Sequence, residues 1–231
     1  MYIYGKNVSQ EYLNGNKKIK KVFLQENFND YNILNLIKSK NIKVNILTKR
    51  DMDKIESGLH QGIILDVEDY RYSTLDTILN LDSSLIVILD HIEDPHNLGA
   101  IIRTCEAAGV DGIIIPTDRS ANVNATVIKT SVGTTENVNL IQVTNLVDTI
   151  NKLKKNGYWI IGTDMNGVDY TQIDYKGKTA IVCGNEGKGM SKLVKSNCDF
   201  IASIPMRGTV NSLNASVATA IVLFEALKNR G

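Results

Sequence analysis

The residues of this sequence that could do chemistry gather in three polar loops. The first loop, residues 90–97, reads D-H-I-E-D-P-H-N and leads into a helical segment that carries Arg103. An arginine in an otherwise apolar helix needs an anionic or hydrogen-bond-accepting partner, because a guanidinium does not lose its proton in a protein. Arg103 is therefore expected either to bind a phosphate of a ligand or to form an internal ion pair. The sequence leaves both open.

The second loop is rich in glycine, and the third leads into a helix. Residues 184–191, G-N-E-G-K-G-M-S, hold three glycines that would let the backbone approach a ligand closely. Their spacing fits neither the Walker phosphate loop nor the dinucleotide fingerprint, so an ordinary tight turn is the alternative. In the third segment, residues 204–218, Ser212 or Asn214 could cap the helix that follows.

The histidines and cysteines lack the spacing of a metal site. His91 and His96 stand beside acidic residues of the first loop, but the arrangement matches no familiar ligand pattern, and we expect no metal. The three cysteines contain no C-x-x-C pair, which argues against a zinc knuckle and against a disulfide framework. Cys105 and Cys183 lie in apolar segments and are expected in the core.

The elements that position these loops alternate regularly from residue 84 onward. Apolar stretches predict strands at residues 85–89, 112–115, 138–143, 159–163, 179–183 and 200–204. Helices are predicted at residues 98–108, 145–156 and 213–228, with the first turn of the first one near Asn97. This alternation implies a mainly parallel α/β sheet covered on both faces. Such sheets bind ligands at the carboxyl ends of their strands, where all three loops lie.

The first seventy residues predict a smaller α/β domain. Strands are expected at residues 20–24, 42–47 and 62–67, and a helix at residues 30–39. Asp51 is expected to cap a short helix that runs to Glu56. An acidic, polar stretch follows. We therefore expect one domain at residues 1–70, a linker at residues 71–83 and a second domain at residues 84–231.

Composition indicates a globular protein with room for one large core or two small ones. Of 231 residues, 43% are hydrophobic and 22% are charged. Neither a signal peptide nor an apolar run of about 18 residues is present, so we expect a cytoplasmic protein without a membrane partner. Net charge is only +1, yet residues 1–54 hold eleven Lys or Arg against five Asp or Glu. The basic cluster there could contact phosphates or be a solvated surface, and it comprises Lys17, Lys18, Lys20 and Lys21.

Taken together, the three loops resemble the motifs of the SpoU/TrmH family of RNA ribose 2′-O-methyltransferases, in the SPOUT superfamily. The matching segments are D-P-H-N-L-G-A-I-I-R at 94–103, I-V-C-G-N-E-G-K-G-M-S at 181–191 and I-P-M-R-G-T-V-N-S-L-N-A-S-V-A at 204–218. Tyr4-Gly5, Val8 and H-Q-G-I at 60–63 are similar to the substrate-binding domain of the same family, which has an L30e-like fold. This layout is most similar to RlmB-type enzymes, which modify a guanosine of 23S ribosomal RNA.

The resemblance implies a fold, a cofactor and partners. The expected fold is a SPOUT domain with a deep trefoil knot at its C-terminal end, although knots are otherwise very rare. The expected cofactor is S-adenosyl-L-methionine, without a metal, and the expected partners are RNA and a second copy of the chain. Thr163 is expected to border the adenine or the ribose. The residues expected to bind the cofactor, mostly through backbone atoms, are Thr163, Gly184, Asn185, Gly187, Ile204, Pro205, Met206 and Leu213.

The same resemblance implies five catalytic residues. In the family, the arginine that matches Arg103 is essential and has been proposed as the general base. Because arginine has a very high pKa, we expect Arg103 to clamp an RNA phosphate instead. Asn97 is expected to orient the first loop, and Glu186 to hold the glycine loop or to orient Arg103. Asn214 and Ser212 are expected to shape the substrate side. For Asn97, Glu186, Asn214 and Ser212, maintenance of the fold is the alternative.

Three alternative functions differ in how well the sequence supports them. Transfer RNA could replace ribosomal RNA as the substrate of the same reaction. A non-catalytic RNA-binding or ribosome-assembly protein is a second alternative, but the intact set of Asn97, Arg103, Glu186 and Asn214 argues against it. A nucleotide-dependent oxidoreductase would need the glycine fingerprint that the chain lacks.

Overall fold

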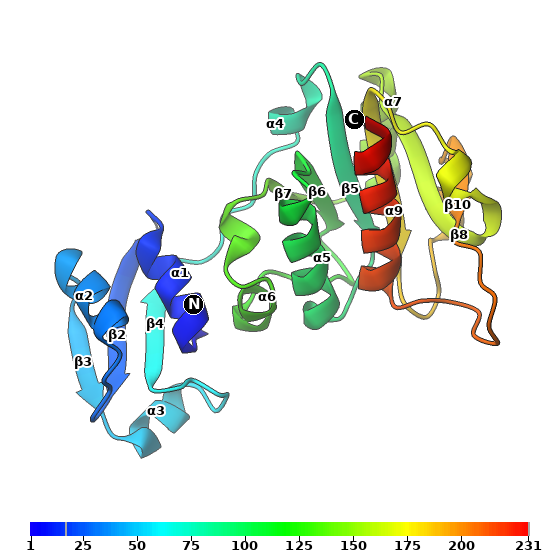
Figure 1. Cartoon of the computed structure of the whole chain (residues 1–231). Coiled ribbons are helices and arrows are strands. Elements are labelled where there is room, and N and C mark those ends of the chain that lie inside the picture. The colour runs from blue at the N-terminus through cyan, green and yellow to red at the C-terminus, as the bar shows by residue number, and fades with distance from the viewer. Residues whose placement is uncertain (17, 231) are drawn as a thin grey trace. The chain divides into compact units, whose positions relative to one another are not determined.

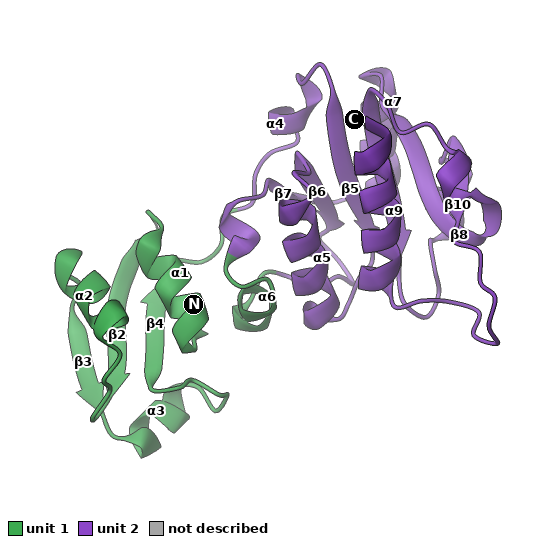
Figure 2. Ribbon diagram, viewed as in Figure 1, with its two compact units in different colours: residues 1–71, 123–133 green, residues 72–122, 134–231 purple. Residues whose placement is uncertain are grey.

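The computed structural model describes residues 1–16 and 18–230, and it divides the chain into two compact units (Figure 2). The first unit comprises residues 1–71 and 123–133, and the second comprises residues 72–122 and the chain from 134 onward. Lys17 of the expected basic cluster lies outside the described residues.

The second unit is built on a six-stranded sheet in which every neighbouring pair is parallel, as the sequence predicted. The strand order is β10-β8-β9-β5-β6-β7. Apolar residues fill the central strands, and every residue of β5 and β6 is buried. The strands are β5 (Ser84–Asp90), β6 (Gly112–Pro116), β7 (Leu140–Val143), β8 (Trp159–Asp169), β9 (Lys178–Gly184) and β10 (Phe200–Ser203).

Helices cover both faces of this sheet, which was also expected. On one face, Ile86 and Ile88 of β5 pack with Ile150 and Leu153 of α7. The intervening strand residues point to the opposite face, where α5 and α9 lie side by side (Figure 1). The helices are α4 (Asp76–Leu79), α5 (Pro95–Ala107), α7 (Leu146–Lys155), α8 (Lys192–Ser196) and α9 (Ala215–Arg230), with 3₁₀ turns at Thr134–Glu136 and Tyr170–Gln172.

Two helices begin earlier than the sequence predicted. Helix α5 starts at Pro95 rather than near Asn97, because Asp94 caps it by accepting a hydrogen bond from the N–H of His96 at 2.9 Å. Proline is favoured at the first helical position, where no backbone donor is needed. Helix α3 (Lys49–Ile55) is capped by Thr48 and not by Asp51. The expected cap at Asp51 was wrong because a better-placed hydroxyl precedes it.

The first unit contains a four-stranded mixed sheet in the order β1-β4-β2-β3. Strands β2 and β3 are parallel, and β4 runs antiparallel to both β1 and β2. The sequence predicted β2, β3, β4, α2 and α3 but missed β1, α1 and α6. The elements are β1 (Tyr2–Tyr4), α1 (Lys6–Asn14), β2 (Ile19–Gln25), α2 (Tyr31–Ser39), β3 (Val44–Leu47), α3 (Lys49–Ile55), β4 (Ile63–Val67) and α6 (Ala125–Thr130).

Helix α6 belongs to the first unit although it is distant from it in sequence. Ile128 of α6 is fully buried in one core with Ile3, Leu13, Ile33 and Leu65. The first unit thus includes a segment that the expected division at residues 70 and 84 would assign to the second domain. The expected domain boundaries at residues 70 and 84 therefore stay a prediction.

The remaining sequence expectations concern cysteines and membranes. Cys105 and Cys183 are buried in the second unit, as predicted, and Cys198 is partly buried. Among the described residues, no helix is both long enough and apolar enough to cross a membrane.

Candidate active site

A cavity of about 450 Å³ opens at the end of β9 and beside residues 163–166 of β8, and segments 184–189 and 204–213 contribute to its walls. Its volume falls within the range of roughly 300–1,000 Å³ that is usual for small-molecule sites. Of the eight residues expected to bind a cofactor, seven line it; only Pro205 does not. These seven are Thr163, Gly184, Asn185, Gly187, Ile204, Met206 and Leu213.

The glycine-rich loop folds back on itself and forms one wall of this cavity. A Cβ atom on Gly184 would lie 2.3 Å from backbone atoms of Gly189 and Met190, so only glycine fits there. The loop is closed by the Asn185 N–H donating to the Gly189 carbonyl at 3.1 Å and by the reverse bond at 2.9 Å. The loop is therefore both a tight turn and a cavity wall.

Strand β8 reaches the cavity through a large bulge. Ile201 of β10 pairs with Gly162, but the next residue, Ala202, pairs with Val168. Residues 163–167 therefore leave the ladder, and bulges of this kind redirect side chains next to functional sites. A Cβ on Gly162 would lie 2.7 Å from a Met190 side-chain atom. On Gly167, it would lie 2.4 Å from the Ile201 carbonyl oxygen.

The bulge brings a charged pair to the cavity that sequence reasoning missed. Asp164 accepts a charge-assisted contact from Lys195 of α8 at 2.8 Å, and both side chains line the cavity. Burial alone would raise the pKa of Asp164, but hydrogen bonds from Lys195 and from the Asn166 N–H outweigh it, so the pKa lies below its usual range. The two glycines that flank residues 163–166 were the only sequence signal of this bulge.

A polar network of Glu186, Asn97 and Asn214 connects the three loops beside the cavity. Asn97 of α5 donates from Nδ2 to Glu186 at 2.6 Å. Its Oδ1 accepts from Nδ2 of Asn214 at 3.0 Å. Asn214 also caps α9, because its Oδ1 accepts from the Ser216 N–H at 2.9 Å. Three of the expected catalytic residues are thus brought together, and a fourth, Ser212, lines the cavity.

Arg103 stands apart from this polar network. Its side chain is exposed on α5, and it forms no hydrogen bond or ion pair with any residue that the structure describes. The internal ion pair that the sequence left open is therefore absent from the described chain. Glu186 bonds to Asn97 and not to Arg103. The guanidinium is left available for an anion that arrives from outside.

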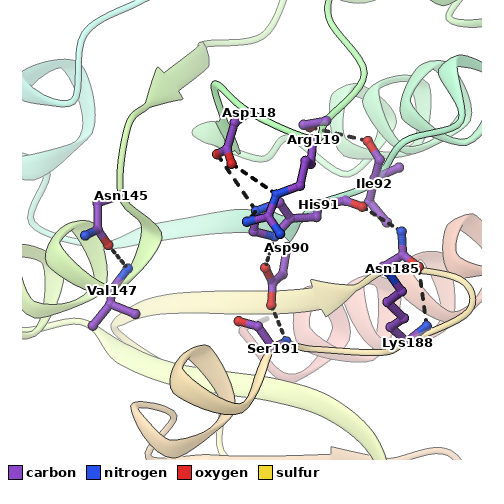
Figure 3. A network of polar contacts seen from close by, with 11 residues as sticks. Asp90, His91, Ile92, Asp118, Arg119, Asn145, Val147, Asn185, Lys188 and Ser191 are labelled. Atoms are coloured by element: carbon purple, nitrogen blue, oxygen red, sulfur yellow. Dashed lines mark hydrogen bonds and ion pairs between the residues drawn. The ribbon is translucent and has the colours of Figure 1, made fainter.

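Asp90 and His91, which the sequence analysis considered as metal ligands, brace the loops instead (Figure 3). Asp90 is buried, and its carboxylate contacts Nδ1 of His91 and the Ser191 N–H, each at 2.6 Å. The His91 carbonyl accepts from Asn185 Nδ2 at 2.8 Å. On the outer side, Arg119 Nη2 lies 3.5 Å from Nε2 of His91. Among the described residues, no cluster of three or more His, Cys, Asp or Glu side chains could hold a metal ion.

Cys183 brings a thiol, a potential nucleophile, to the wall of this cavity. Burial raises the pKa of this thiol to about 11, although hydrogen bonds with Thr219 and Thr163 act in the opposite direction. The thiol is therefore neutral near pH 7 and is a poor nucleophile.

Two sequence families match the chain. The profile of the SpoU rRNA Methylase family matches residues 84–224. A profile described as RNA 2′-O ribose methyltransferase substrate binding matches residues 2–73. The two matches together span nearly the whole chain.

Individual relatives agree with these families. A Staphylococcus saprophyticus protein assigned to the TrmH family of tRNA/rRNA methyltransferases is 41% identical, over 99% of this chain and 95% of its own length. The structure of an AdoMet-bound rRNA methyltransferase from Sinorhizobium meliloti has a TM-score of 0.83 at 28% identity, and the match covers 98% of this chain and 86% of that one. A TrmH/SpoU tRNA modifying enzyme from A. aeolicus has a TM-score of 0.58 at 34% identity, covering 64% of this chain and 75% of that one.

Proposed function

The chain belongs to the SpoU family of RNA methyltransferases, and on that premise we propose that it methylates a ribose 2′-hydroxyl of a 23S ribosomal RNA guanosine. S-adenosylmethionine is the methyl donor. The observation that carries the proposal is the polar network Glu186–Asn97–Asn214, which joins all three motif loops beside one cavity. Metal or redox chemistry would not require that arrangement.

The residues of the cavity suit S-adenosylmethionine. Gly184 lines the cavity without a side chain, and Ile204 and Leu213 add apolar surface that an adenine ring would need. Asp164 and Lys195 offer opposite charges, which match the ammonium and the carboxylate of the amino-acid end. When bound, the cofactor supplies a methyl group activated by a positively charged sulfur.

The residues of the chain act mainly by positioning. A guanidinium does not give up its proton in a protein, so we assign Arg103 to hold an RNA phosphate and not to remove the hydroxyl proton. Asn97 holds the start of α5 against Glu186 and Asn214, which fixes the direction from which Arg103 can reach the RNA. Alignment of this kind can supply a large part of the rate enhancement of a displacement reaction.

The fraction of this chain that each solved relative matches favours ribosomal RNA over transfer RNA as the substrate. The rRNA enzyme from Sinorhizobium meliloti matches 98% of this chain, whereas the tRNA enzyme from A. aeolicus matches 64%. A match that long must include most of residues 2–73, which the substrate-binding profile covers. Transfer RNA remains the second candidate, because the curated relative is named for both.

Two further features belong to the proposal. We expect the loops around 184–191 and 204–213, which meet at one cavity, to be threaded as the trefoil knot of the SPOUT superfamily. We also expect a homodimer. Helix α9 exposes an apolar stripe of Val217, Phe224 and Leu227, which are 47%, 49% and 39% exposed. A patch of this kind is more often covered by a partner than left in water.

The test uses purified protein, labelled S-adenosylmethionine and either unmodified 23S ribosomal RNA or total transfer RNA, followed by nucleoside analysis. Formation of 2′-O-methylguanosine from ribosomal RNA alone is expected. The same product from transfer RNA alone would overturn the substrate but keep the chemistry. Failure of the protein to bind the cofactor would overturn the reaction and favour a non-catalytic RNA-binding protein.

A further inference from the structure

The first unit contains a second hollow, of about 640 Å³, that the methyl-transfer chemistry does not use. Two segments form most of its wall: the loop at residues 25–29, which follows β2, and the turn at residues 57–62, which precedes β4. Lys6 and Lys49 complete the rim.

Both segments are held in conformations that the chain does not adopt by default. Asn27 and Gln61 have positive φ values of 66° and 53°, and Gly62 has a φ of 82°. Non-glycine residues in this region are uncommon and are found preferentially at turns and binding sites. The backbone of the two segments is joined where the Gln25 N–H donates to the Gly62 carbonyl at 2.9 Å.

A buried histidine fixes the turn beneath the hollow. His60 is 4% exposed, and its Nδ1 accepts from the Gly62 N–H at 3.0 Å. Its Nε2 lies 3.0 Å from the carboxylate of Asp53. Gln61 is held as well, because its Oε1 accepts from the Lys6 N–H at 2.8 Å. The hollow is therefore organised before any ligand arrives.

The side chains around the hollow include one phenyl ring, several amides and two lysine ammonium groups. Phe28 is half-buried, and the Lys6 ammonium lies 5.4 Å from the centre of its ring. The exposed amides of Asn27 and Asn29 form no hydrogen bond with the described residues. Aromatic rings stack on bases, and Asn or Gln amides match the paired donor and acceptor atoms of base edges. Glu26 and Asp53 also line the hollow, so it is not a simple phosphate site.

We propose that this hollow binds one unpaired nucleotide of the RNA substrate, with its base stacked on Phe28 and its edge read by the amides of residues 25–29 and Gln61. The identification of the ligand as RNA rests on the proposed function. Single-stranded RNA segments are recognised in this way because their bases can be turned out of the stack. The base would displace the Lys6 ammonium from the Phe28 ring, and Lys6 and Lys49 would then face the phosphates on either side.

The experiment titrates the full-length ¹⁵N-labelled chain with AMP, GMP, CMP and UMP, and with ribose 5-phosphate as the control lacking a base. Saturable NMR shifts of the Gly62 N–H and of the Asn27 and Gln61 side-chain amides are expected with at least one nucleotide. Ribose 5-phosphate should leave these signals nearly unchanged. Absence of shifts with all four nucleotides, or equal shifts with ribose 5-phosphate, would overturn the proposal.

Three variants sharpen the test. Phe28→Leu should weaken nucleotide binding by about tenfold or more through lost stacking. Asn27→Gly suits the positive φ at that position, so it should fold normally yet bind a few times more weakly. Tyr31→Leu is the matched control, because Tyr31 is 80% exposed on α2 and does not line the hollow. Equal binding by Phe28→Leu and Tyr31→Leu would reject the stacking site.

Calorimetric binding of S-adenosylmethionine is measured on the same samples. It depends on the second unit, so a chain that binds nucleotides here but no cofactor would keep this site and reject the proposed reaction. The converse result would reject only this site.

Discussion

Arg103 lies outside the hydrogen-bond network that holds the start of its helix. The side chains of the Glu186–Asn97–Asn214 network bond to one another, whereas the guanidinium on the same helix as Asn97 faces outward without a partner among the described residues. A group that makes its contacts only after RNA arrives contributes to substrate positioning and little to folding.

We therefore expect Arg103→Lys to retain part of the methylation activity and Arg103→Ala to lose almost all of it. Lysine keeps the positive charge but not the two-pronged geometry, so a drop of about 10- to 100-fold is reasonable for Arg103→Lys. Single-turnover methylation and RNA binding are measured together. Complete inactivity of Arg103→Lys with unchanged RNA affinity would contradict the phosphate role and reopen that of a base.

Asp164 and Lys195 give a second prediction at the residue scale. Asp164→Asn and Lys195→Met should each weaken S-adenosylmethionine and S-adenosylhomocysteine binding by about tenfold, the loss of one charge-assisted contact. Binding of 5′-methylthioadenosine, which lacks the amino-acid end, serves as the internal control and should not change. An equal loss for all three ligands would mean that the pair only holds the bulge at residues 163–167.

The same pair has a defined pH dependence. The pKa of Asp164 is lower in the folded protein than the usual aspartate value of about 3.9. The ionised carboxylate therefore contributes stability at pH values above about 4, and this contribution is lost as the pH falls through the folded-state pKa. Between pH 6 and 8 the Asp164 carboxylate stays ionised, so it should add no pH dependence to calorimetrically measured cofactor binding.

Among the elements, the turn that follows β9 allows the sharpest test. The loop can pass beneath its own backbone only because position 184 lacks a Cβ, whereas a Cβ added to Gly187 would have no neighbour closer than 3.7 Å, a distance of ordinary contact. The two glycines of one loop therefore have different roles.

Gly184→Ala should destabilise the protein by about 1–3 kcal/mol through overpacking and should weaken S-adenosylmethionine binding as the loop shifts. Gly187→Ala is the matched control and should change the free energy of unfolding by no more than about 0.5 kcal/mol. Urea unfolding and calorimetry provide the two readouts. Equal stability of the two variants would show that the loop can relax away from the close contact.

On the scale of the whole molecule, charge is distributed unevenly. Net charge is only +1, yet Lys18, Lys20 and Lys21 of the basic cluster lie on or next to β2 of the first unit. Lys18 lies 3.4 Å from the carboxylate of Glu68, but its side chain is 76% exposed. Its positive charge is therefore still accessible from solvent. Exposed pairs of this kind contribute little to stability.

Replacing Lys17, Lys18, Lys20 and Lys21 with Gln should lower RNA affinity and flatten its dependence on salt, because each phosphate contact releases a counterion. A slope reduced by about one unit per lost contact is expected, with an unchanged melting temperature. Replacement of Lys152 and Lys155 of α7 is the control for general charge. Unchanged affinity and slope would mean that the cluster is only a solvated surface.

Oligomeric state is the other property of the whole molecule that can be tested. Phe224→Asp places a charge in the apolar stripe of α9 and should convert a dimer into a monomer, as read by light scattering. Tyr31→Asp, at an exposed position in the first unit, should leave the molecular mass of the oligomer unchanged. If the wild-type chain is monomeric by light scattering, the predicted homodimer is wrong.

The sequence by itself determined the three motif loops and the parallel sheet behind them. A five-residue apolar run such as 85–89, which is short for a helix and rich in β-branched residues, is typical of a strand buried on both faces, and this local pattern needs no distant information. Seven of the eight residues expected around the cofactor line one cavity for the same reason, since the carboxyl ends of parallel strands meet at one edge.

Tertiary structure decided what depends on contacts between distant residues. Asn97 meets Glu186 across 89 positions and Asn214 across 117, and α6 joins a core built from the first seventy residues. Asp164 reaches Lys195 only because β8 leaves the ladder at Gly162 and rejoins it at Val168. Local propensity cannot encode such pairings, because their energy arises only when segments far apart in the chain pack together.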